Sequence, residues 1–288
     1  MWAATAGFAT HNADDPQIPL LLSVPHAGRD YPAALFDNLR IPPGCLLRLE
    51  DRYADILTRA AVAASVPTII ATRARAWIDL NRSEQDIDAA MVEGLNAADY
   101  PAAGAKQRGG LGLIPRRLSG AGDIWKSRFT ADDVTARIAN YHRPYHDRVA
   151  GQLKAISARF GTALLLDLHS MPPLANIAAK DPPRFVVGDL FGCSAAGHFS
   201  DLAVSYFRAR GFAAALNYPY SGDYILRRHA NPAGHIHALQ LEVDRSLYLD
   251  ADLREPTANA AQIADLIAGL IRLLADAAAG HAMPVAAE

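Results

Sequence analysis

Two short runs of apolar residues constrain the fold of this chain most. Residues 18–24 read IPLLLSV and residues 162–168 read TALLLDL. Both runs have the length of a β-strand, and both carry apolar side chains on either face. A strand of this kind is stable only in a sheet that helices cover on both sides. The two runs therefore predict an α/β fold built on a central sheet.

Four more segments have the length of strands, and the stretches between them have helical periodicity. We expect strands at 68–72, 77–80, 185–187 and 238–243. We expect helices at 51–64, 199–210 and 257–279, and a long amphipathic helix over 134–156 that Pro144 should kink or break. Alternating strands and helices favour a mostly parallel sheet.

No internal repeat or linker divides the 288 residues. We therefore expect a single α/β domain over 1–288, with a mostly parallel mixed central sheet flanked by helices. Residues 1–16 and 281–288 are expected to be loosely ordered tails. Residues 84–127 are rich in Gly and Ala and have little periodicity, which is typical of a long lid or binding loop.

The composition excludes several classes of partner. Hydrophobic residues make up 51% and charged residues 20%, and the formal net charge is −2, so no strong field attracts nucleic acid or an anionic membrane. No apolar run approaches the roughly 20 residues of a membrane helix, and the N-terminus does not resemble a signal peptide. The two cysteines have no CxxC spacing, which fits a reducing cytoplasm. We expect a cytoplasmic protein, and the sequence leaves its oligomeric state open.

Polar residues stand at the ends of the expected strands. His26 follows LLLSVP, and His169 follows LLLDL. In open α/β sheets ligands bind outside the carboxyl ends of the strands, and a catalytic zinc needs three protein ligands and a free position for water. Glu50 or Asp51 would supply the third ligand. Spacing alone leaves a zinc site and separate structural roles both open.

Glu242 lies in the expected strand 238–243, within ALQLEV. Left unligated, its carboxylate would take a proton from the water. The alternation of Leu239, Leu241 and Val243 with polar residues fits a half-exposed edge strand equally well.

Several basic residues are suited to recognising a carboxylate. Asn81 and Arg82 close DLNR, and Arg75 and Arg143 offer further guanidinium groups, although surface ion pairs are the ordinary alternative. His142 and His146 have the i, i+4 spacing of a metal pair, but Arg143 stands where HExxH has Glu. We expect His146 to line a substrate pocket instead.

Eight stretches taken in order resemble the N-formylglutamate amidohydrolase family. They are SVPHAGRDYP (23–32), LEDRYADIL (49–57), ARAWIDLNRS (74–83), GLGLIP (110–115), YHRPYHDRV (141–149), LLLDLHSMP (164–172), NYPYSGDYI (217–225) and HALQLEVDRSLYLD (237–250).

The resemblance implies a zinc-carboxypeptidase-like (phosphorylase/hydrolase-like) fold, one Zn²⁺ or another divalent metal per chain, and a small carboxylate substrate. The implied reaction is hydrolysis of N-formyl-L-glutamate to formate and L-glutamate in histidine degradation. Carried over, His26, an acid of LEDR and His169 are metal ligands, Glu242 is the general base, and Arg82 binds a substrate carboxylate. Between Glu50 and Asp51 we choose Asp51.

Two other functions remain open. One is a related zinc-dependent hydrolase with a different acyl group or amino acid. The other is a non-catalytic ligand-binding domain on the same scaffold.

Overall fold

The computed structural model describes residues 7–96, 102, 104–174 and 181–281. Its centre is a mixed seven-stranded sheet with the strand order β1-β3-β2-β6-β9-β7-β8. The strands are β1 (Phe8–His11), β2 (Leu20–Val24), β3 (Thr68–Ala71), β6 (Ala163–Met171), β7 (Phe185–Gly188), β8 (Ala214–Leu216) and β9 (Ile236–Asp244). Strand β2 pairs in parallel with β3 and β6, β6 with β9, and β7 with β8, whereas β7 and β9 are antiparallel. The predicted α/β fold with a mostly parallel mixed sheet is confirmed.

The chain forms two compact units. One contains residues 10–24, 52–70 and 149–288, and the other contains residues 1–9, 25–51 and 71–148. The first unit holds nearly all of the sheet.

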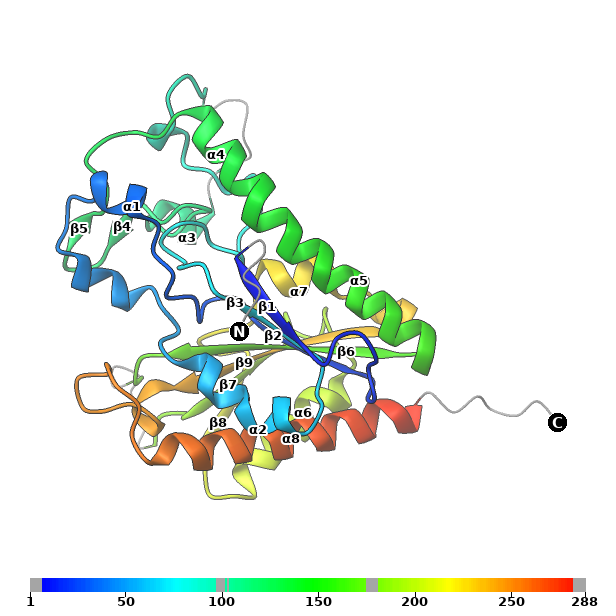
Figure 1. Cartoon of the computed structure of the whole chain (residues 1–288). Helices are drawn as coiled ribbons and strands as arrows, with labels where there is room; N and C mark the ends of the chain where they lie inside the picture. The colour runs from blue at the N-terminus through cyan, green and yellow to red at the C-terminus, as the bar shows by residue number, and fades with distance from the viewer. Residues whose placement is uncertain (1–6, 97–101, 103, 175–180, 282–288) are drawn as a thin grey trace. The chain divides into compact units, whose positions relative to one another are not determined.

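Helices cover both faces of the sheet in this first unit (Figure 1). Helix α8 (Asn259–His281) packs on β2 and β6, α6 (Gly197–Arg208) packs on β7, and α7 (Tyr224–His229) packs on β9. Every residue of β2 and β6 is buried, which explains why both were visible as uninterrupted apolar runs. Helix α8 buries Ile263, Ile267, Leu270, Ile271 and Leu274 at helical spacing.

The second unit is built from short elements. These are α1 (Ala33–Asp37), η1 (Pro43–Arg48), η3 (Ala89–Met91), α3 (Ala105–Arg108), a two-stranded sheet of β4 (Arg117–Leu118) and β5 (Gly122–Asp123), and α4 (Ala131–Arg137). Thr130 begins α4 with a capping box, in which its hydroxyl accepts from the backbone N–H of Asp133 at 3.1 Å. Buried Arg137 stacks on Trp77 and Phe129, and burial lowers the pKa of Arg137 to about 10.

The expected helix over 134–156 is present, with its irregularity where Pro144 requires it. Helix α4 passes through one π-helical stretch, η5 (Ile138–His142), into α5 (Arg143–Phe160). Proline lacks an N–H, and its ring clashes with the carbonyl four residues earlier, so a wider turn at this point relieves the strain.

Three expectations about single elements were wrong or incomplete. Residues 77–80 form turns and irregular backbone instead of a strand. The helix expected over 51–64 is shorter and consists of η2 (Ala54–Thr58) and α2 (Arg59–Ala63), because Tyr53 has a left-handed backbone with φ of 58°. Strand β1 lies within the segment that we expected to be a loose tail.

Two other predictions stay predictions. Within 84–127 the described residues include buried side chains such as Ile87, Leu113 and Trp125, and residues 97–101 and 103 lie outside the description. That this segment is a lid or binding loop therefore stays a prediction. The expected tail at 281–288 also lies outside the described residues, apart from His281 at the end of α8. Among the described helices, none has the length and apolar character of a membrane span.

Candidate metal centre

His26 and Asp51 are placed next to each other by a backbone hydrogen bond. His26 follows the end of β2 by two residues, and Asp51 comes three residues after η1. The backbone N–H of Asp51 donates to the carbonyl of His26 at 2.9 Å. Both side chains are buried, and Nδ1 of His26 lies 3.5 Å from Oδ2 of Asp51.

His169 lies inside β6, which continues to Met171, two residues beyond the position that we expected to follow the strand. Its Nε2 is 2.7 Å from Oδ2 of Asp167. Residues i and i+2 of a strand share one face, so β6 itself brings the two side chains together. Oδ1 of Asp167 accepts from the Ser23 hydroxyl at 2.8 Å on the neighbouring strand β2.

His26, Asp51 and His169 form a group that can bind a metal ion. One ligand atom from each lies within 4.8 Å of the other two, and all three residues are buried. The 3.5 Å between His26 and Asp51 is less than twice the zinc–ligand bond length of about 2.0–2.1 Å, so one ion can reach both atoms.

The partners of the two imidazoles also fit a metal site. Nε2 of His26 lies 2.7 Å from Oδ1 of Asp79, and Nε2 of His169 lies the same distance from Asp167. Histidines that bind metals almost always donate their other ring N–H to such an acceptor. Two nitrogens and one carboxylate oxygen are a donor set of catalytic zinc, with the fourth position left for water.

Glu50, the alternative ligand, is engaged elsewhere. Its Oε1 accepts a hydrogen bond from the hydroxyl of Tyr31. This contact, together with the place of Asp51 in the metal-binding group, supports the choice of Asp51.

Asp79 is a buried carboxylate beside the metal-binding group. Besides His26, it contacts Nε of Arg75 at 2.8 Å and Nε of Arg82 at 4.0 Å. Burial alone would raise the pKa of the Asp79 carboxyl, but the charges of Arg75, His26 and Arg82 and the hydrogen bond from His26 hold that pKa well below its ordinary value. Nothing in DLNR distinguishes a buried carboxylate from an exposed one, so the sequence does not point to Asp79.

Arg82 and Asn81 are buried, which excludes a surface ion pair for Arg82. Nε of Arg82 donates to the carbonyl of Leu111 at 2.8 Å, and its Nη1 donates to the carbonyl of Asn81 at 2.6 Å. The backbone N–H of Asn81 donates to Oδ1 of Asp79 at 2.9 Å. Asp79, Asn81 and Arg82 therefore form one hydrogen-bonded segment beside His26.

His142 and His146 hold the backbone of this same segment. Their Nε2 atoms lie 2.8 Å from the carbonyl of Arg82 and 2.9 Å from that of Leu80, respectively. The rings are fully buried, with centroids 4.4 Å apart. Arg143, by contrast, points to an exposed ion pair with Glu84, at 2.8 Å from Nη2.

Glu242 is buried in the interior of the sheet. Strand β9 lies between β6 and β7, so the alternative of an edge strand was wrong. Glu242 is opposite His169 in the register of β6 and β9, and its Oε1 accepts from Nε2 of Gln240 at 3.0 Å. A carboxylate therefore stands on the strand next to a residue of the metal-binding group.

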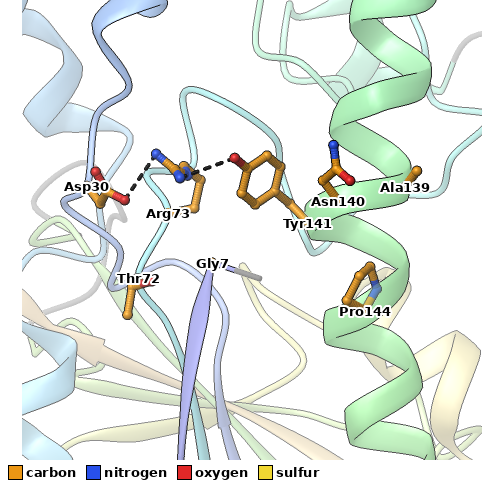
Figure 2. Close-up of a pocket in the computed structure, with 8 residues that line it drawn as sticks. All are labelled: Gly7, Asp30, Thr72, Arg73, Ala139, Asn140, Tyr141 and Pro144. Carbon is orange, nitrogen blue, oxygen red and sulfur yellow. Dashed lines mark hydrogen bonds and ion pairs between the residues drawn. The ribbon is translucent and has the colours of Figure 1, made fainter. Parts of the chain in front are cut away.

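A separate cavity of about 500 Å³ lies in the second unit, and none of the predicted site residues lines it (Figure 2). Arg73 is its central side chain, at 3.0 Å from Asp30 and with Nη2 3.2 Å from the hydroxyl of Tyr141.

Comparison with known proteins identifies the family. The model of the N-formylglutamate amidohydrolase family matches residues 18–249. The chain belongs to this family. A protein of Ralstonia eutropha JMP134 named N-formylglutamate amidohydrolase is 31% identical, and its crystal structure superimposes with a TM-score of 0.88 over 96% of this chain and 99% of that one.

Curated relatives carry a related name. Proteins named N-formylglutamate deformylase from Pseudomonas putida and Pseudomonas aeruginosa are 30% and 28% identical, over 84% and 90% of this chain and 88% and 91% of theirs. A structure from Agrobacterium tumefaciens, 16% identical with a TM-score of 0.62 over 94% of this chain and 95% of that one, shares the fold. The resemblance stated from the sequence motifs is confirmed.

Proposed function

We propose that this protein hydrolyses the amide bond of N-formyl-L-glutamate to formate and L-glutamate, with one zinc ion held by His26, Asp51 and His169. The observation that carries the proposal is this buried group, in a chain whose family and relatives bear the name of that reaction. We also propose that the protein acts in histidine degradation, in the cytoplasm.

The residues around the metal-binding group would prepare it for catalysis. Asp79 and Asp167 each accept at Nε2 of one histidine, which leaves Nδ1 of His26 and of His169 as the ligating nitrogens. When bound, zinc lowers the pKa of water toward about 7 and polarises a carbonyl oxygen.

Glu242 is the proposed general base. It would take a proton from the water whose oxygen attacks the formyl carbon. As the C–N bond breaks, Glu242 would return the proton to the departing amine nitrogen. The support is its burial on β9 opposite His169.

Arg82, Asn81 and Arg75 are the proposed binding residues for the substrate's carboxylates. A guanidinium binds a carboxylate through two parallel hydrogen bonds, and the burial of Asn81 and Arg82 reduces the competition of water. His146 would contribute through its bond to the Leu80 carbonyl. Arg143 stays in the proposed set, but its guanidinium is engaged by Glu84, so we expect it to contribute less.

The test is a metal analysis paired with an assay on a panel of N-formyl, N-acetyl and N-succinyl derivatives of Glu and Asp. We expect one zinc per chain and the highest kcat/KM on N-formylglutamate. A higher value on another member would assign the chain to the related hydrolases. A protein that binds no zinc and hydrolyses none of them would be the non-catalytic ligand-binding domain.

A further inference from the structure

Asp79 is a fully buried carboxylate whose two oxygens face two different sets of partners. Oδ1 lies 2.7 Å from Nε2 of His26, a member of the metal-binding group. Oδ2 lies 2.8 Å from Nε of Arg75 and 4.0 Å from Nε of Arg82, the proposed binding residues for substrate carboxylates. One side chain therefore contacts both halves of the proposed site.

The backbone fixes the orientation of this carboxylate. The N–H of Asp79 donates to the carbonyl of Leu113 at 2.8 Å, and Oδ1 of Asp79 accepts from the N–H of Asn81 at 2.9 Å. An Asp that accepts from the backbone two residues later forms an Asx-turn, which limits the rotation of its side chain. The contacts of Oδ1 and Oδ2 are therefore set by the same local structure.

Asp167 provides a natural comparison. It is also fully buried and lies 2.7 Å from Nε2 of a histidine in the metal-binding group, His169. Its other oxygen, however, accepts from the Ser23 hydroxyl, and in the described part of the chain no guanidinium pairs with it. Asp79 and Asp167 thus share the contact with a histidine and differ in the contact with arginine.

We infer that Asp79 is a positioning residue that holds His26 for the metal and Arg75 and Arg82 for the substrate carboxylate at the same time. This inference rests on the proposed function. The charge of Asp79 orients the N–H of His26 through Oδ1 and attracts the two guanidinium groups through Oδ2. Loss of that charge should therefore weaken metal binding and substrate binding together, whereas loss of the charge of Asp167 should weaken metal binding alone.

The experiment compares Asp79→Asn with Asp167→Asn and with Asp30→Asn, and measures zinc affinity by competition with a chelator and kcat and KM at saturating zinc. Residues that orient a metal ligand typically account for about 10–100-fold in metal affinity, so both Asp79→Asn and Asp167→Asn should lose zinc affinity in that range. In Asp79→Asn, KM for N-formylglutamate should also rise by at least about tenfold, as expected when a charge-assisted contact is disturbed. Asp167→Asn should leave KM unchanged.

Asp30→Asn is the matched control, because Asp30 also pairs with an arginine, Arg73, in the same unit but outside the proposed site. It should change neither zinc affinity nor KM. Asp79→Glu keeps the charge on a longer side chain and should restore part of the substrate affinity. If Asp79 had only a structural role, Asp79→Asn would lower the stability of the fold without the selective rise in KM.

Several results would overturn the inference. Asp79→Asn that matches Asp30→Asn in zinc affinity and KM would remove Asp79 from the site, and Asp79→Asn that matches Asp167→Asn would remove the link to arginine. If Asp79→Asn does not fold, the double variant Asp79→Asn, Arg75→Gln removes both charges of the pair, and its zinc affinity should still be reduced. Zinc affinity is read without turnover, so a wild-type protein inactive on N-formylglutamate would refute the proposed function and leave the metal half of the inference testable.

Discussion

Buried carboxylates differ in this protein by what they touch. Asp79 and Asp167 each bond to a histidine of the metal-binding group, whereas Oε1 of Glu242 accepts from the neutral amide of Gln240. A carboxylate that orients a ligand is held in place, and a general base must be able to exchange a proton with water. The place of Glu242 on β9, opposite His169 in the register, is what supports it as the proposed base.

We predict that Glu242→Gln keeps its zinc and its affinity for N-formylglutamate but loses turnover. General acid–base groups contribute about 10²–10⁴-fold, so kcat should fall by a factor in that range. Steady-state kinetics and metal analysis of the purified variant check this. An unimpaired variant would move the role of base to another carboxylate, with Asp244 or Asp167 the first to test.

The second residue-scale prediction concerns Arg82. Its Nε and Nη1 already donate to the carbonyls of Leu111 and Asn81, so the planar group is fixed in one orientation. Lysine lacks the planar set of N–H donors of a guanidinium and acts as a point charge. Arg82→Lys should raise KM and lower kcat/KM by roughly 10–150-fold, the equivalent of about 1.5–3 kcal/mol for a charge-assisted hydrogen bond, without a change in zinc content.

Arg117→Lys is the control for this substitution, since Arg117 forms an exposed ion pair with Asp123 in the same unit. Its kcat/KM should match that of the wild type. If the kcat/KM of Arg82→Lys also matched that of the wild type, Arg75 would become the leading candidate for the residue that binds the substrate carboxylate.

At the scale of elements, the strands that the sequence revealed are those buried on both faces. The runs that became β2, β3 and β7 are almost wholly apolar, and β6 begins with the apolar run ALLL. In β9 apolar residues alternate with polar ones, so length and pattern were enough for all five strands. Strand β8 has only three residues, AAL, which are too few to show a strand pattern. Residues 77–80 have a strand-like composition, but Asp79 accepts from Arg75 and Asn81 nearby in the sequence and contacts His26 across 53 residues. These contacts override the strand preference.

The site was predictable in part for a similar reason. His26 stands out because it follows the buried strand β2, and His169 because it lies near the carboxyl end of the buried strand β6. Parallel strands bring their carboxyl ends to one edge of a sheet. The contact between His26 and Asp79 spans 53 residues, a separation that leaves no spacing signal. Asp167 does leave one, since it precedes His169 by two residues on a strand, and that i, i+2 pair was the clue available in the sequence.

One glycine tests how tightly the segment after β2 is packed. A Cβ on Gly28 would lie 2.0 Å from the backbone oxygen of Arg73. Both the added atom and its neighbour belong to or adjoin backbone, which cannot move aside as the end of a flexible side chain can. Gly28→Ala should therefore cost at least about 1–3 kcal/mol, the usual cost of overpacking. His26 is two residues away, so zinc affinity should fall as well.

The measurement is thermal unfolding together with a zinc titration. For a protein of this size 1 kcal/mol corresponds to about 2–4 °C, so Tm should drop by several degrees. Gly44→Ala is the control, because a Cβ there would meet no atom within 4 Å. Equal Tm and zinc affinity in the two variants would show that the backbone near Gly28 adapts freely.

At the scale of the whole molecule, the proposed metal ligands come from segments far apart in the sequence. His26, Asp51 and His169 have ligand atoms within 4.8 Å of one another only in the folded chain. An unfolded chain does not hold these atoms together, so an ion that binds here binds the native state in preference. Metal and stability are then linked by mass action.

The last prediction follows from this linkage. A ligand that binds only the folded state stabilises it by RT ln(1 + [L]/Kd), which is about 2.7 kcal/mol when free zinc is 100 times Kd. Zinc added to chelator-treated protein should therefore raise Tm progressively and restore hydrolysis over the same range of concentration. His169→Ala should abolish both responses, because two ligands do not complete the site. Scanning calorimetry at several zinc concentrations, paired with the assay, is the measurement. A Tm that rises equally in His169→Ala would locate the stabilising ion elsewhere, and activity that survives complete removal of zinc would show that hydrolysis does not depend on it.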